Sequence, residues 1–215
     1  MTNSKIELKA NKLLSDFCNH KKQEILTPIP VIDILEYLGY DIDFRNDGIY
    51  EDKTILGGVI PKKKIVELNE ILTENEGRLN FTVAHEIGHI ILHLSDTNQN
   101  VMYRDHKNCK DEIEEKNKKK VEIEADKFAS YLLMPTNIIK NTFFTYYKKP
   151  LNLSKFSISY LFFRKSKKQK AFRVASKICE TGNFSNVSKT AIVNRLIGLQ
   201  LIRGIPFQSN TIKRR

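Results

Sequence analysis

Residues 85–89 read His-Glu-Ile-Gly-His, inside the longer stretch 81–94, FTVAHEIGHIILHL. The two histidines are four positions apart, so in a helix their imidazoles lie one turn from each other and can reach one metal ion. Glu86 lies beside this pair, where its carboxylate can take a proton from water activated by the metal. The stretch therefore predicts a helix with a catalytic zinc site, in which His85 and His89 are metal ligands and Glu86 is the catalytic base.

The rest of this helix, expected from about Asn80 to Leu94, supports the assignment. Its apolar residues cluster on the side opposite the histidines, so one face can be buried while the histidines line a cleft. This apolar set is Val83, Ala84, Ile87, Ile90, Ile91 and Leu94. His93 lies two turns beyond His85, about 12 Å along the axis, and cannot share a small ion with both other histidines.

A catalytic zinc needs a third protein ligand, and the best candidate lies in residues 121–129, VEIEADKFA. Glu122 and Asp126 are four positions apart on one flank of a predicted helix, whereas Glu124 projects from the opposite flank. Glu122 as ligand, with Asp126 hydrogen-bonded to a ligand histidine, makes a chemically complete site. His106 and the acids of residues 111–115 are alternative ligands.

Such a site predicts hydrolysis of a peptide bond, with Glu86 passing its proton to the leaving amine. The residue that would stabilise the oxyanion is left open among Tyr103, His106 and Tyr131. The predicted hairpin before the histidine helix offers an edge strand to which a peptide could add.

Elements before this site follow from periodicity and turn residues. We expect helices over 4–19 and 31–38, the second ended by Gly39, and a strand over 40–44. Two β-favouring runs, 54–60 and 65–68, flank Pro61-Lys62-Lys63-Lys64 as a hairpin. Residues 96–120 are polar and lack apolar periodicity, which predicts a mobile excursion, and a helix over about 121–134 stops at Pro135.

Beyond Pro135 the sequence predicts a basic helical part. Helical stretches are expected over 137–147 and 156–179, and Gly182 ends the second of them. Ser188 is a good N-cap for a last helix, followed by a strand or tail over 199–205. This order is the outline of a helix-turn-helix unit, although Asn194 and Arg195 are the only prominent base-reading candidates on its last helix.

Composition and charge limit the classes of protein to which the chain can belong. The chain has 215 residues, 40% hydrophobic and 28% charged, with a net charge of +11, which fits one or two globular domains. Residues 1–135 carry 19 Lys/Arg and 24 Asp/Glu, whereas residues 136–215 carry 17 and one. The basic part predicts DNA or an acidic protein surface as its partner.

The sequence also argues against several classes. No apolar run approaches the roughly 20 residues that cross a bilayer, so no membrane contact is expected. Residues 1–10 hold no hydrophobic signal core, and the three cysteines have no paired spacing, which argues against a disulfide framework. We expect a cytoplasmic protein.

Two of these segments resemble one known family. Residues 81–93, together with residues 122–135, EIEADKFASYLLMP, resemble the ImmA/IrrE family of metallo-endopeptidases. Residues 187–202, VSKTAIVNRLIGLQLI, are similar to the helix-turn-helix-like segment of that family. The resemblance implies His85, His89 and Glu122 as ligands, Glu86 as base, and site-specific cleavage of a helix-turn-helix transcriptional repressor. Such cleavage relieves repression of a mobile element, prophage or stress response.

Together these observations predict an α+β protein with a zincin-like metalloprotease core of helices packed on a small sheet, followed by a helical, helix-turn-helix-like C-terminal domain. The boundary is expected between a peptidase domain over 1–136 and a basic helical domain over 137–215. The cofactor is expected to be Zn²⁺, although such N/O sites accept other divalent ions. The alternative function is a DNA-binding regulator whose metal site is structural or sensory, with DNA contacted through the basic residues 136–215.

Overall fold

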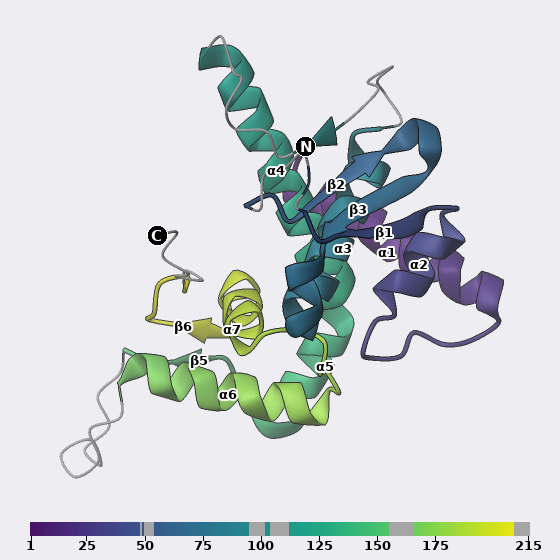
Figure 1. Ribbon diagram of the computed structural model, residues 1–215. Coiled ribbons are helices and arrows are strands. Elements are labelled where there is room, and N and C mark those ends of the chain that lie inside the picture. The colour runs from purple at the N-terminus through teal and green to yellow at the C-terminus, as the bar shows by residue number, and fades with distance from the viewer. Residues whose placement is uncertain (48, 50–53, 95–101, 104–111, 155–165, 209–215) are drawn as a thin grey trace. The chain divides into compact units, whose positions relative to one another are not determined.

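Figure 1 shows the computed structural model of the chain, which describes residues 1–47, 49, 54–94, 102–103, 112–154 and 166–208. Its contacts divide the chain into two compact units, Met1–Leu133 and Met134–Arg215. Helices and small sheets together make an α+β fold. No helix in the described ranges is long and apolar enough to cross a membrane.

The first unit is built on a four-stranded sheet with the order β1-β3-β2-β4. β1 (Asp41–Arg45) pairs parallel with β3 (Ile65–Asn69), and β2 (Gly57–Ile60) pairs antiparallel with both β3 and β4 (Met102–Tyr103). β2 and β3 form the predicted hairpin, closed by the 3-10 turn η1 (Pro61–Lys63) and by Lys64 in the left-handed conformation.

The hairpin does not provide the edge strand that the sequence suggested. β2 and β3 are the two interior strands of the sheet, because β1 covers the outer side of β3 and β4 pairs with Gly58 and Val59 of β2. The edges are therefore β1 and β4. The sequence pattern gives strands but not their order, which depends on pairing between distant segments.

Besides η1, five helical segments accompany the sheet in this unit, among the residues that the structure describes. They are α1 (Asn3–Lys21), α2 (Val31–Tyr37), the 3-10 turn η2 (Glu70–Glu74), α3 (Glu76–Leu92) and α4 (Glu112–Leu133). α3 packs against α4, α2 and β2, and α1 packs against α4. Asn75 caps α3, because its side chain accepts a hydrogen bond from the backbone N–H of Arg78 at 2.9 Å.

α4 begins nine residues earlier than expected, and this is a correction to the predicted mobile excursion. Residues 112–120 are helical, although their charged sequence lacks an apolar stripe. Glu and Lys are good helix formers, and the turns that follow are anchored by α3 and α1. Residues 95–101 and 104–111 of the same excursion lie outside the described residues.

A close approach of backbones joins α3 to α4. A β-carbon built on Gly88 would lie 3.1 Å from the Cα and 3.2 Å from the carbonyl oxygen of Ala125. The two helices therefore approach closely at this point because Gly88 has no side chain. This contact lies one residue before His89 on α3 and three residues after Glu122 on α4.

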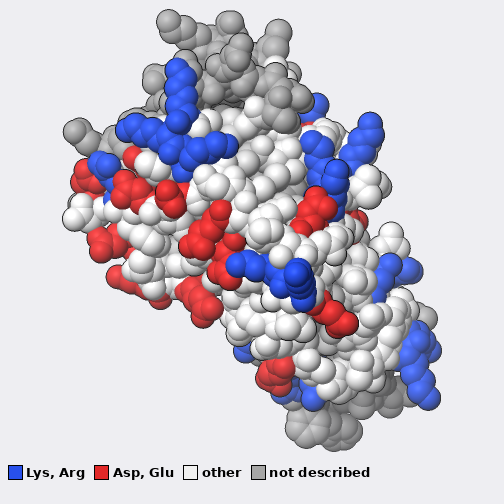
Figure 2. Space-filling view, turned by 90° about the vertical axis from the view of Figure 1, so that its right-hand side faces the viewer, with Lys and Arg blue, Asp and Glu red and all other residues white. Residues whose placement is uncertain are grey.

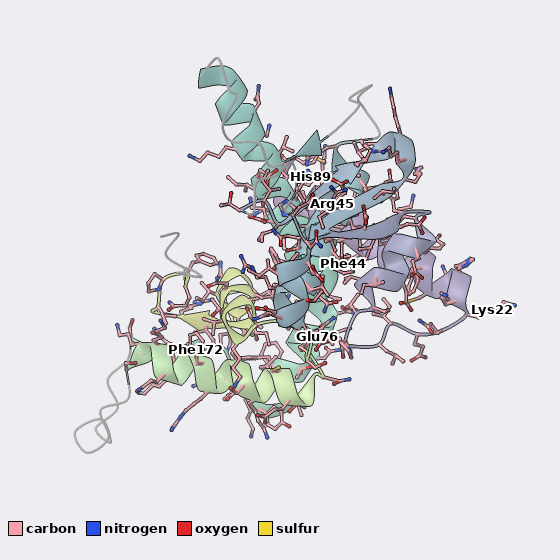
Figure 3. The ribbon with its side chains drawn as sticks, in the orientation of Figure 1. Lys22, Phe44, Arg45, Glu76, His89 and Phe172 are labelled. Carbon is pink, nitrogen blue, oxygen red and sulfur yellow. The ribbon has the colours of Figure 1, made fainter. Side chains whose placement is uncertain are left out.

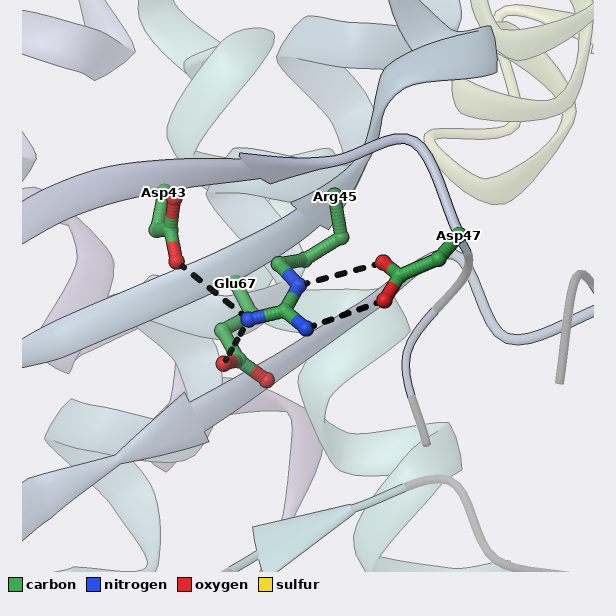
Figure 4. Close-up of polar contacts among 4 residues, drawn as sticks. All are labelled: Asp43, Arg45, Asp47 and Glu67. Atoms are coloured by element: carbon green, nitrogen blue, oxygen red, sulfur yellow. Dashed lines mark hydrogen bonds and ion pairs between the residues drawn. The ribbon is translucent and has the colours of Figure 1, made fainter. Parts of the chain in front are cut away.

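An exposed ion cluster covers part of the sheet (Figure 4). Arg45 on β1 donates two hydrogen bonds to the carboxylate of Asp47, at 3.3 and 3.2 Å, and its Nη1 lies 3.7 Å from Glu67 and 3.9 Å from Asp43. The guanidinium lowers the pKa of Asp47 through this hydrogen bonding. Because the side chains of Arg45, Asp43 and Asp47 are 40–54% exposed, water screens the cluster and it adds little to stability.

The second unit contains three helices and a two-stranded parallel sheet in its described residues. These are α5 (Thr136–Tyr146), β5 (Leu151–Asn152), α6 (Lys167–Thr181), α7 (Lys189–Gly198) and β6 (Ile202–Arg203), with β5 paired to β6. Ser188 caps α7 by accepting the N–H of Ala191 at 3.1 Å, which confirms the predicted cap. Ser166 and Gln169 cap α6 reciprocally. The helix expected over 156–179 lies partly outside the described residues.

The two base-reading candidates on α7 are engaged inside this unit. Arg195 is 6% exposed and donates to the carbonyl of Met134 at 3.0 Å and to Oγ1 of Thr136 at 2.6 Å. Asn194 exchanges two hydrogen bonds with the backbone of Gln208, at 2.8 and 2.7 Å. Neither side chain is presented for reading bases.

Candidate metal centre

α3 carries the two histidines of the motif into the interior rather than into an open cleft. Every residue from Thr82 to His89 is buried, with His85 at 0% and His89 at 4% exposure. The helix is partly exposed before this stretch, at residues 77–81, and after it, at Ile90 and Ile91. The helix is therefore not two-faced as predicted, because α4 covers the histidine side while the sheet and α2 lie against other parts of α3. His89 is labelled in Figure 3.

The structure brings His85, His89 and Glu122 together into one cluster. The two Nε2 atoms are 2.9 Å apart, and the Glu122 oxygens Oε2 and Oε1 each lie 3.3 Å from the Nε2 of His85 and His89, respectively. All three donor atoms lie within 4.8 Å of one another. Other groups of three such side chains are absent from the described residues.

These separations fit a divalent ion. Bonds of about 2.0–2.1 Å in a tetrahedron set neighbouring donor atoms about 3.3–3.4 Å apart. The Nε2–Nε2 separation of 2.9 Å is close to that value, and each Nε2 atom lies 3.3 Å from one of the two Glu122 oxygens. Two imidazoles and one carboxylate are also a donor set typical of catalytic zinc sites, which keep one position open.

Asp126 determines which ring nitrogen of His85 carries the proton. Its Oδ1 lies 2.8 Å from Nδ1 of His85, so that Nδ1–H donates to the carboxylate and Nε2 keeps its lone pair. The lone pair points into the cluster with Glu122 and His89. The carboxylate thereby orients the imidazole and raises its basicity as a ligand, as carboxylates behind histidine ligands commonly do.

Glu122 is held in its ionised form. Burial raises its pKa, but the neighbouring imidazoles of His85 and His89 outweigh burial and hold the pKa well below its ordinary value. The carboxylate is 21% exposed, so it lies between the buried histidines and solvent. An anionic carboxylate beside two imidazole nitrogens has the charge that a divalent cation requires.

Glu86 is buried beside the cluster with an oxygen that has no partner. It is 2% exposed, and its Oε1 makes no hydrogen bond with any described residue. A β-carbon built on Gly57 of β2 would lie 2.8 Å from this oxygen and 2.9 Å from Cγ2 of Thr82. A buried carboxylate oxygen without a donor is costly, which is typical of a group that works with a ligand or a substrate.

Gly57 was not singled out from the sequence as part of the site. The available signal was the Gly57-Gly58 pair inside a β-favouring run, since glycine within a strand often marks a close approach of another group. Which group approaches depends on the tertiary packing of β2 on α3.

The other candidates lie apart from the cluster. Glu124 is buried on the opposite flank of α4 and forms an ion pair with the amino group of Met1. The His93 ring lies 5.6 Å from that of His89 but outside the donor cluster, and burial lowers the pKa of His93 to about 4. His106 and the side chains of 111–115 lie outside the described residues.

A comparison with models of known families identifies the family of the chain. The family model described as the IrrE N-terminal-like domain, Peptidase M78, matches residues 42–175. The match begins in β1, contains the whole donor cluster and ends in α6. No curated protein matches the sequence.

Proposed function

The chain belongs to the IrrE N-terminal-like family of peptidases, and from this premise we propose that it is a zinc-dependent endopeptidase that cleaves a helix-turn-helix transcriptional repressor at one site. Membership of this family indicates a metallopeptidase with a protein substrate. The specific repressor, and the release of a mobile element, prophage or stress response from repression, belong to the proposal.

The observation that carries the proposal is the arrangement of Glu86 beside the donor cluster. His85, His89 and Glu122 are the proposed metal ligands, and Asp126 holds His85. A purely structural metal site needs its ligands but has no use for a buried carboxylate with an unpartnered oxygen next to them. This favours hydrolysis over the alternative of a structural or sensory site.

In this mechanism each residue has a defined task. When bound, a divalent ion supplies Lewis-acid activation of water and of the scissile carbonyl. Glu86 accepts the proton of the attacking water and delivers it to the leaving amine. Asp126 keeps the Nδ1 proton of His85 in place, so that the Nε2 atom of His85 remains available as a ligand.

The domain assignment and location follow the same proposal. Residues 1–136 would form the zincin-like peptidase domain and residues 137–215 a basic helical domain with a helix-turn-helix-like segment. DNA contact through residues 136–215 is part of the proposal, although Asn194 and Arg195 are engaged internally. Because a repressor works on DNA, we propose a cytoplasmic location for its protease.

The test is co-expression with a small repressor encoded beside this gene. We expect one cleavage product with the wild-type chain and none with Glu86→Gln, which keeps the size and hydrogen-bonding shape of the side chain but cannot accept the proton. Glu36→Gln, an exposed change in α2, is the matched control and should cleave normally. Cleavage by Glu86→Gln at the wild-type rate would contradict the assigned mechanism.

A further inference from the structure

A groove lies along the outward face of α6, away from the donor cluster in sequence and within the second unit. It has a volume of about 750 Å³, and its lining includes the cations Arg173 and Lys177 of α6 and Lys189 of α7. Phe172, Gln169 and Ser176 contribute an aromatic ring, an amide and a hydroxyl to the same lining, and Glu180 contributes one carboxylate. Phe172 is labelled in Figure 3.

The positive charge of this groove exceeds its negative charge, because three cations and one carboxylate, that of Glu180, line it. Glu180 is the only carboxylate side chain among residues 136–215, against 17 Lys and Arg. Arg173, Lys177 and Lys189 form no ion pair within 4.0 Å with any described acid, and Lys177 instead lies 4.6 Å from the Tyr146 ring centroid. By contrast, the face drawn in Figure 2 carries acidic and basic side chains interspersed.

The chemistry of the lining matches a phosphate backbone. Arg and Lys, with Ser and Gln side chains, are the usual donors to phosphate oxygens in protein–DNA complexes. Arg173 and Lys177 lie four residues apart, about 6 Å along the helix. Duplex DNA carries about one negative charge per 1.7 Å of its axis, so phosphates meet these cations in any register.

Reading of bases is not part of this binding mode. The polar side chains of α7 that could enter a major groove, Asn194 and Arg195, are bonded within the unit. Binding through Arg173, Lys177 and Lys189 depends on charge rather than on sequence, and it falls steeply with salt. An acidic protein surface would present scattered carboxylates rather than a continuous row of charge.

We infer that the α6 groove, lined by Arg173, Lys177 and Lys189, holds the phosphate backbone of DNA without recognition of sequence. Binding of DNA by this groove would concentrate the protease where a repressor lies, and this role rests on the proposed function. The binding itself does not, because it involves neither the donor cluster nor Glu86.

The test measures the affinity of the full chain for a short mixed-sequence DNA duplex by fluorescence anisotropy, at salt concentrations from about 50 to about 200 mM. The Glu86→Gln variant serves as the parent, so the result does not depend on peptidase activity. In this background, Arg173, Lys177 and Lys189 are replaced together by Gln, which is a good helix former. The matched control replaces Lys140, Lys148 and Lys149 by Gln, three exposed cations of the same unit that do not line the groove.

We expect the groove variant to lower the slope of log affinity against log salt by about 2.7, which is 0.9 for each of three phosphates, and to weaken binding about 100-fold or more near 0.1 M salt. The control variant, with the same net charge, should lose much less. The single change Lys177→Gln should lower the slope by about 0.9 and provides the same test if the triple variant does not fold.

Three outcomes would overturn the inference. Equal weakening by the groove and control variants would show that net charge alone attracts DNA. No binding of the parent at about 50 mM salt would exclude a phosphate site. Displacement of DNA by polyglutamate at equal charge concentration would identify an acidic protein as the occupant. None of these results bears on the proposed peptidase, which the co-expression experiment tests separately.

Discussion

Gly57 of β2 faces the catalytic candidate Glu86, because a β-carbon at residue 57 would lie 2.8 Å from Oε1 of that carboxylate. Carbon and oxygen atoms cannot approach so closely, so the position of Glu86 depends on the absence of a side chain at Gly57. Thr82 and Leu68 surround the same point, at 2.9 and 3.3 Å from that β-carbon. The strand therefore forms the wall against which the proposed base is placed.

Gly57→Ala should lower kcat by about 10- to 100-fold, because a displacement of about 1 Å at a reacting group has effects of this size. Zinc content should stay at the wild-type level, since Gly57 does not contact the donor cluster. Kinetics on the repressor and metal analysis of the same preparation measure the two quantities. Gly198→Ala, where a β-carbon meets nothing within 4 Å, is the control. Wild-type kcat in Gly57→Ala would contradict the role of the close approach.

Glu122→Ala should remove most of the zinc from purified protein, whereas Glu124→Ala should retain it. The first change deletes one of three donor side chains. The second deletes a carboxylate on the opposite flank, which pairs with the Met1 amino group. Metal per chain measured by atomic absorption tests both, and equal loss in the two variants would refute Glu122 as a ligand.

Asp126→Asn should weaken metal affinity by about 10- to 100-fold, as loss of a carboxylate behind a histidine ligand typically does. The amide cannot accept the Nδ1 proton of His85 with the strength of a carboxylate. Competition with a chelator of known affinity measures the change. Asp16→Asn, an exposed substitution on α1, removes the same charge and should leave affinity unchanged. A parallel loss there would show that net charge, not the 2.8 Å contact, is responsible.

Gly88→Ala should destabilise the protein by about 1–3 kcal/mol, the usual cost of overpacking. Helix propensity alone would make the alanine variant more stable by about 1 kcal/mol. A decrease in the free energy of unfolding would therefore show that the contact with Ala125 is tight. The added methyl would lie 3.1 Å from Cα of Ala125, and backbone cannot move aside as a side chain can. Urea unfolding with chelator present isolates packing from metal binding. Stabilisation would show that α3 and α4 can separate freely.

Arg195→Gln should lower stability by about 2–3 kcal/mol, because a buried charged donor to the carbonyl of Met134 is lost. Arg203→Gln is the control, since Arg203 is exposed and should change stability by less than about 0.5 kcal/mol. Urea unfolding of both variants makes the comparison. Equal urea midpoints for the two variants would mean that the Arg195 hydrogen bonds make no net contribution to stability.

Much of the first unit could be predicted, because short-range rules act there. The four-residue spacing places His85 above His89, and the same spacing places Glu122 and Asp126 on one flank of α4. The ends of α2 and of the hairpin followed from Gly39 and from the proline–lysine turn. These features depend on helix periodicity and on turn residues, which are local properties.

Other features depended on contacts between distant segments. The sequence made Arg195 a candidate for reading bases, but the structure buries it against Met134. Periodicity cannot say which partner a polar residue will find. The start of α4 at Glu112 was missed because charged residues with high helix propensity lack an apolar stripe. The contact of Gly57 with Glu86 involves two elements whose packing no local rule specifies.

The proposed ligands lie on two helices that the chain joins only through residues 93–111, so an ion bonded to His85, His89 and Glu122 would close a loop in the manner of a cross-link. Such a bond restricts the unfolded chain and adds its binding free energy to folding. The ion would then stabilise the folded unit as well as take part in hydrolysis. Metal supply in the cell would set how long each protease molecule survives, in addition to how fast it works.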